Sequence, residues 1–180
     1  MTVRPNRVAA NFAPKKTPDF PRNPYCLYMS QQKEIISTIN DLIETLKDGQ
    51  EGFRQASEAV KDTQLKSLFS EYSLQRSKFA GELQNEAIGL GESNPENTSS
   101  TAGAMHRAWI NLKSAITSGD DHAVLAECER GEDSAVNEYK KAMEDKDLSS
   151  PVRETISRQY TDVKNAHDRI KALRDATRNN

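Results

Sequence analysis

Apolar residues recur along the chain at the three- and four-residue spacing of amphipathic helices. This spacing predicts long helices over 30–61, 64–89, 121–144 and 150–175, and a shorter helix over 101–117. The sequence shows no alternation of apolar and polar residues that would indicate strands. The pattern therefore predicts an all-α protein.

The segments between the predicted helices carry turn and capping residues. Lys61-Asp62-Thr63 is so short that the helices on either side must be antiparallel neighbours. Residues 89–100 are rich in Gly, Ser, Asn and Pro and predict a loop. Asp120 or Asp121 can cap the helix over 121–144, and a serine followed by Pro151 begins the last helix.

Two antiparallel helical hairpins with a crossover helix between them form the connectivity of a ferritin-like four-helix bundle. We expect Trp109 to anchor the crossover helix on this bundle. Gly49 and Gly52 interrupt the first helix and predict a bend or a close helix contact.

The first 29 residues predict a disordered basic arm, and residues 30–178 the bundle. The arm has five prolines and no apolar period, so it is not expected to hold a helix or strand. Residues 1–24 carry five basic residues and one acidic residue, against a net charge of −2 for the chain. An organelle-import signal is the alternative interpretation of this arm.

The remaining acidic body makes nucleic-acid binding unlikely except through the arm, because phosphate contacts dominate such affinity. No stretch reaches the roughly 20 apolar residues of a membrane span, and no secretory signal begins the chain. We therefore expect a soluble cytoplasmic protein. Cys26 and Cys128 are then expected to be free thiols, with Cys128 buried and inert.

Several segments resemble a family of ferritin-like four-helix-bundle proteins of unknown function, known from bacteria and some fungi. The resemblance spans 36–175 and rests on INDLIETLKDGQEGF (39–53), FAGEL (79–83), AGAMHRAWINLKSAI (102–116), AVLAECERGEDSAVNEY (123–139) and AHDRIKALRD (166–175). It implies the fold and a loose association with stress response. It implies no established activity.

Ferritin-like di-iron proteins bind metal through a Glu on each of two helices and a Glu-x-x-His pair on each of the others. Glu132 and His167 lie on the apolar stripes of the two last long helices and within a turn of the same height. The rest of the motif is broken, because Lys164 stands three residues before His167 and Gln75 three residues before Lys78. An iron or other divalent-metal site would use Glu132 and His167 with Glu51 or Glu82.

The alternative to a metal site is a buried hydrogen-bonded cluster that sets the register of the hairpins. Its candidate members are Gln75, Arg76, Glu132, Tyr160 and His167. His106 and His122 are expected to be surface or capping residues. The chain has no phosphate-binding loop, nucleophile elbow, His-Glu-x-x-His or Cys-x-x-Cys motif.

These observations favour a non-enzymatic bundle, with no cofactor, that acts by assembly or partner binding. A homodimer is the expected assembly, and the sequence names no protein partner. A metal-binding oxidase or iron-handling protein with a degenerate site is the alternative function. A further alternative is an adaptor whose arm docks on an acidic partner, nucleic acid or a membrane surface.

Overall fold

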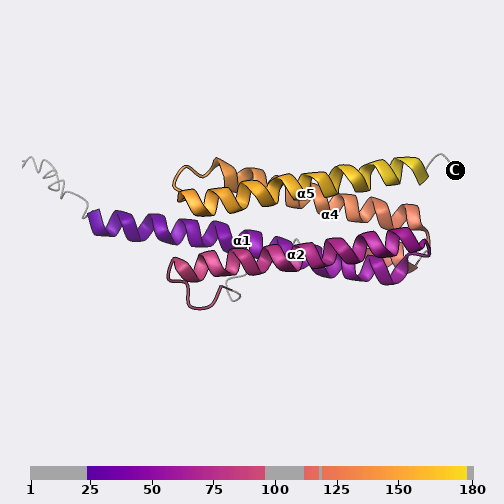
Figure 1. Cartoon of the computed structure of the whole chain (residues 1–180), viewed down its shortest axis with the longest axis horizontal. Coiled ribbons are helices and arrows are strands. Elements are labelled where there is room, and N and C mark those ends of the chain that lie inside the picture. Colours follow the sequence, from indigo (N-terminus) through magenta and orange to yellow (C-terminus); the bar gives the residue numbers. More distant parts are fainter. Residues whose placement is uncertain (1–23, 96–111, 118, 178–180) are drawn as a thin grey trace, which may run out of the picture.

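The computed structural model describes residues 24–95, 112–117 and 119–177 (Figure 1). Within these residues the chain is helical, contains no strand and forms four long helices, α1 (Pro24–Ala59), α2 (Thr63–Gly89), α4 (Asp121–Glu144) and α5 (Ser150–Thr177). No helix in the described part of the chain is long and apolar enough to cross a membrane. Residues 112–117 are also helical, while the rest of the expected crossover helix, with His106 and Trp109, lies outside the described residues.

The helix bounds lie close to those expected from the periodicity. α4 has the bounds of the predicted helix over 121–144, and α2 differs by one residue at its start. The largest difference is at α1, which begins at Pro24 and not at residue 30. A proline suits the first helical position because its fixed φ is already helical and no N–H is needed there. The expected arm therefore loses residues 24–29 to the helix, and residues 1–23 lie outside the described residues.

Aspartates begin two of the helices. The Asp62 carboxylate accepts hydrogen bonds from the N–H groups of Gln64 and Leu65, at 2.7 and 2.9 Å, and so caps α2. Asp120 caps α4 in the same way through the His122 N–H, at 2.9 Å. At the other end of α2, Gly91 adopts φ 91°, a conformation that favours glycine and ends the helix.

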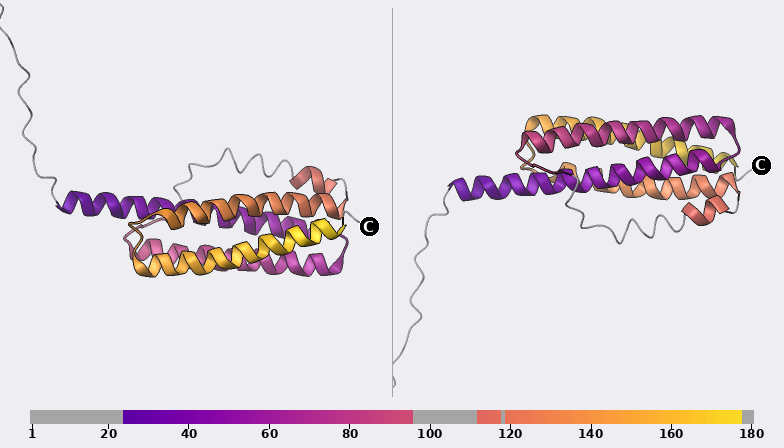
Figure 2. Two further views of the ribbon diagram at one scale, coloured as in Figure 1. Left: turned by 90° about the horizontal axis from the view of Figure 1, so that it is seen from above. Right: turned by 90° about the horizontal axis from the view of Figure 1, so that it is seen from below.

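The four long helices lie side by side, each antiparallel to its neighbours (Figures 1 and 2). α1 contacts α2 and α4, and α5 contacts α4 and α2. The start of α4 lies at the α1–α2 turn, where the Asp121 carboxylate accepts hydrogen bonds from the N–H groups of Lys61 and Asp62. The chain from the end of α2 to the start of α4 therefore spans the length of the molecule.

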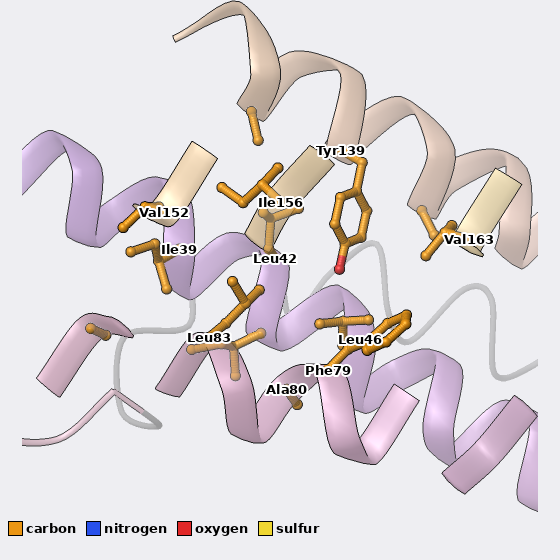
Figure 3. Close-up of a cluster of buried hydrophobic side chains, with 14 of the residues drawn as sticks. Ile39, Leu42, Leu46, Phe79, Ala80, Leu83, Tyr139, Val152, Ile156 and Val163 are labelled. Carbon is orange, nitrogen blue, oxygen red and sulfur yellow. The ribbon is translucent and has the colours of Figure 1, made fainter. Parts of the chain in front are cut away.

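The hydrophobic core has two parts. One lies toward the α4–α5 turn and contains, among others, Ile39, Leu42, Leu46, Phe79, Leu83, Tyr139, Val152, Ile156 and Val163 (Figure 3). The other lies toward the α1–α2 turn and contains Phe53, Val60, Phe69, Leu112, Leu125, Cys128 and Ile170, among others. Between the two parts the helices bring polar side chains into the interior, and this layer is the candidate functional site.

Candidate functional site

An ion pair occupies the interior between the two parts of the core. Arg76 of α2 is 1% exposed and Glu132 of α4 is 2% exposed. Arg76 Nη2 donates to Glu132 Oε2 at 2.5 Å. A charged hydrogen bond in a dry interior is strong, but the desolvation of both groups offsets much of its contribution. The intact pair therefore adds little to the free energy of folding, whereas removing one partner alone would cost much stability.

The Arg76 side chain lies against Gly49 of α1, where the missing side chain makes room for it. A Cβ atom at position 49 would lie 3.5 Å from Arg76 Cγ and 3.6 Å from Cδ, which is ordinary van der Waals contact. The expected close helix contact at Gly49 is therefore a contact with this side chain. A Cβ atom at Gly52, one turn along, would lie 3.8 Å from Leu112 Cδ2.

Two further groups hold the guanidinium. Gln75 Oε1 accepts a hydrogen bond from Arg76 Nη1. The Phe53 ring lies with its centroid 5.6 Å from Arg76 Cζ, within range of a cation–π contact. Arg76 Nε is buried and has no hydrogen-bond partner among the described residues. The cation is thus contained by one carboxylate, one amide and one aromatic ring.

The electrostatics of the layer follow from its burial. Burial raises the pKa of Glu132, and the nearby Arg76 guanidinium opposes that shift. Burial likewise raises the pKa of the Tyr139 hydroxyl and of the Cys128 thiol. The Tyr139 phenol and the Cys128 thiol are therefore held protonated, and neither is activated as a base or nucleophile.

A second polar connection lies within the core toward the α4–α5 turn. Tyr139 Oη donates to Gln159 Oε1 at 2.7 Å (Tyr139 in Figure 3). The Gln159 amide donates to Phe79 O at 3.2 Å and to Glu82 Oε2 at 2.8 Å. Arg158 also donates to Glu82, at 2.7 Å. This chain joins α4, α5 and α2 and satisfies the buried amide of Gln159.

Glu132 and His167 do not form the expected pair. His167 contacts Asp133 through Nε2 and Asp168 through Nδ1, each at 2.9 Å. The interior stripe of α5 runs through Val163, Ala166 and Ile170, which places His167 at the edge of the buried face. A helical spacing of three or four residues admits either Ala166 or His167, and the smaller apolar residue takes the interior position.

The other predicted site residues lie apart from this pair. Glu51 is on the surface of α1, bonded to Arg54 and Gln55, and Arg54 lowers its pKa. Glu82 is bonded to Arg158 and Gln159. Tyr160 is partly buried against the core. Of the predicted polar cluster, the structure brings together Gln75, Arg76 and Glu132 and leaves out Tyr160 and His167.

Three side chains that the sequence analysis had not combined do lie together. Glu129, Asp133 and His167 place one ligand atom each within 4.8 Å of the others. The sequence signal is the four-residue spacing of Glu129 and Asp133, which puts both carboxylates on one face of α4. It was hidden because the neighbouring Glu132 points into the core.

The fold and this site define an all-helical protein whose interior is divided by a buried ion-paired layer. A family model described as "Domain of unknown function (DUF2383)" matches residues 34–145, and the chain belongs to that family. The match ends at the α4–α5 turn, so the segment 166–175, which contributed to the resemblance, lies beyond it. No curated protein matches the chain significantly.

Proposed function

We propose that this chain is a ferritin-like four-helix bundle that acts by assembly and carries out no oxygen chemistry in its interior. The single observation that carries the proposal is the Arg76–Glu132 ion pair at the centre of the molecule. The antiparallel hairpins and the long connection between α2 and α4 support the ferritin-like class. The stress-related role that the resemblance implies stays a prediction.

The interior residues do not fit a di-iron centre. Such a centre needs several carboxylates, with histidines completing the coordination of each ion. Here one carboxylate is already neutralised by a guanidinium, and His167 points to the edge of the α4–α5 pair. The Arg76 cation fixed beside Glu132 repels a dication. The layer is therefore suited to holding the two hairpins in register.

The outer face of α2 is the surface that best fits an assembly role. Leu74 is 73% exposed and Ile88 is 56% exposed, and each lies seven residues from Gly81. Seven residues is close to two full turns, so all three positions share one face. The same face carries Ser67, Ser70, Ser77 and Asn85, and the charged residues Glu71 and Lys78 lie along one edge of it. Nothing among the described residues lies within 4 Å of a Cβ atom at Gly81.

A second copy of this chain is the partner that this face fits. If two α2 helices cross antiparallel at Gly81, each Leu74 meets the partner's Ile88, and the contact is self-complementary. Glycine at the crossing point lets the backbones approach closely. Serines and an asparagine make up the middle of this face, and their burial costs less than that of charged side chains. The expected homodimer is therefore formed through α2.

The chemical part of the proposal is tested by aerobic oxidation of ferrous iron by the full chain. We expect no acceleration over protein-free buffer. Acceleration that is lost in Glu132→Gln and kept in His167→Gln would overturn the proposal and establish an iron-handling or oxidase function in the interior. Circular dichroism checks that both variants are folded.

The assembly part is tested by sedimentation velocity over a wide range of protein concentration. We expect a dimer in the wild-type chain, and a monomer for Leu74→Glu and for Gly81→Glu. Ser157→Glu, at an exposed position of α5, is the matched control and should stay dimeric. A wild-type monomer at every concentration, or a dimer that both α2 variants preserve, would contradict the proposed interface.

A further inference from the structure

We propose that Glu129, Asp133 and His167 form a binding site for one divalent metal ion on the flank of the α4–α5 pair. This site goes beyond the proposed function, because it uses neither the Arg76–Glu132 layer nor the α2 face. The three residues offer two carboxylate oxygens and one imidazole nitrogen, with all three ligand atoms within 4.8 Å of one another. This set of donors suits Zn²⁺ and similar divalent ions.

The helices bring the ligands together without a loop. Glu129 and Asp133 are four residues apart and project from the same face of α4. His167 reaches them from α5, with Nε2 2.9 Å from Asp133 Oδ1. Donor atoms around a tetrahedral Zn²⁺ lie about 3.3 Å apart. The three ligand atoms, which already lie within 4.8 Å of one another, must therefore move closer together when a metal ion binds.

The surroundings of the imidazole favour a bound cation. His167 Nδ1 lies 2.9 Å from Asp168 Oδ1, while Nε2 lies equally close to Asp133. A neutral imidazole has only one N–H, so one of these contacts would set a nitrogen lone pair against a carboxylate. A second ring proton or a metal ion at Nε2 removes that repulsion. Asp168 then holds the N–H at Nδ1 and orients the ring, as carboxylates behind metal-binding histidines do.

Two basic side chains lie beside the carboxylates of the site, and one of them competes directly with a metal ion. Glu129 is 6% exposed, so its carboxylate is almost enclosed by the protein. The guanidinium of Arg174 contacts Glu129 Oε2 in an ion pair. Lys164 neutralises Asp168 at 2.6 Å. Arg174 therefore occupies one side of Glu129, and a metal ion must share or displace it.

The remaining coordination position faces solvent, because the Asp133 side chain is 60% exposed. Three protein ligands with one open position leave room for water. The ion would join α4 to α5 near the level of the buried ion pair and so stabilise the second hairpin.

The experiment is calorimetric titration of the metal-free full chain with Zn²⁺, together with the absorption spectrum of bound Co²⁺. We expect one ion per chain and an intense visible band from Co²⁺ in tetrahedral coordination. His167→Gln should lower the affinity at least about tenfold, and Asp168→Asn by about 10–100-fold. Arg174→Gln should raise the affinity, because it removes the competing cation.

His122→Gln is the matched control, since His122 lies on α4 beside Thr177 and away from the three ligands. Its Zn²⁺ affinity should equal that of the wild type. Zn²⁺ binding that is unchanged in His167→Gln, or reduced equally in His122→Gln, would overturn the site. Neither result would alter the iron-oxidation or sedimentation outcomes, so the two proposals fail separately. A higher thermal midpoint on adding Zn²⁺, absent in His167→Gln, is the second readout.

Discussion

Arg76 of α2 and Glu132 of α4 form an ion pair between two described helices that are diagonal in the bundle and make no backbone contact with each other. The long arginine side chain crosses the interior to make this contact, over the space that Gly49 leaves. The pair divides the core into two parts and ties one hairpin to the other. The first prediction tests how much the fold depends on it.

Replacing Arg76 by methionine should lower the free energy of unfolding by about 3–5 kcal/mol, because Glu132 would stay buried without its counter-charge. Urea unfolding followed by circular dichroism measures this loss. The double variant Arg76→Met, Glu132→Leu should recover most of the stability, since a buried pair can often be replaced by apolar residues. Losses that simply add in the double variant would show that the two charges are not coupled.

Gly49→Ala should stabilise the protein by about 0.5–1 kcal/mol, because alanine favours the helix and its Cβ fits against the Arg76 side chain. Gly119→Ala should destabilise it, because Gly119 has φ 65° in the segment before α4. Thermal unfolding of the two variants gives the comparison. If Gly49→Ala is the more harmful change, the Arg76 side chain has less room than the structure shows.

Burial, followed by the charge of Glu44, raises the pKa of Asp48 from 3.8 to about 7. The folded chain then binds more protons than the unfolded chain between these two values, so the contribution of Asp48 to stability falls as pH rises through this window. Asp48→Asn should therefore stabilise the protein by about 1–2 kcal/mol above the folded pKa, allowing for partial exposure to solvent.

Urea unfolding of wild type and Asp48→Asn at acidic and mildly alkaline pH measures the difference. The gain should shrink toward the acidic end, where Asp48 is protonated in the folded chain. Glu154→Gln, at an exposed position of α5, is the control and should show no such dependence. A gain that is equal at both pH values would mean that Asp48 is not titrating in this range.

The Cys128 thiol should resist alkylation in the folded protein, because it is buried and burial raises its pKa. A Cys26→Ser background isolates Cys128. Its reaction with iodoacetamide should be at least about a hundredfold slower in the folded state than in urea. Comparable rates in the two states would identify Cys128 as an accessible and reactive thiol.

The periodicity of the sequence predicted where the helices lie in the chain. It did not predict which side of each helix faces its neighbours. Apolar spacing placed α4 at its observed bounds and α5 within two residues of its end. It missed the start of α1, because the prolines before Pro24 outweighed the helical character of residues 24–29. Helix termini depend on one or two residues, whereas a stripe is repeated over many turns.

The same limit explains the candidate site. Glu132 was recognised because it interrupts an apolar stripe, and the structure shows it buried beside Arg76. The sequence analysis predicted His167 in the interior because His167 and its neighbour Ala166 both fit the spacing of the buried residues. In the structure Ala166 takes the buried position. One position on a helix is a rotation of about 100°, which moves a side chain from the core to its edge. Only the packed helices show which of the two faces inward.

The segment that matches the family model ends earlier in the chain than the packed core does. The match ends at residue 145, before α5 begins, whereas α5 supplies Val152, Ile156 and Val163 to the core (Figure 3). A chain truncated after Asp145 would hold every matched residue and still leave Tyr139 and Leu83 without the helix that covers them. Gln159, the partner of Tyr139, would be lost with it. The part recognised by sequence is therefore smaller than the packed core, and an expressed chain should extend beyond the end of α5.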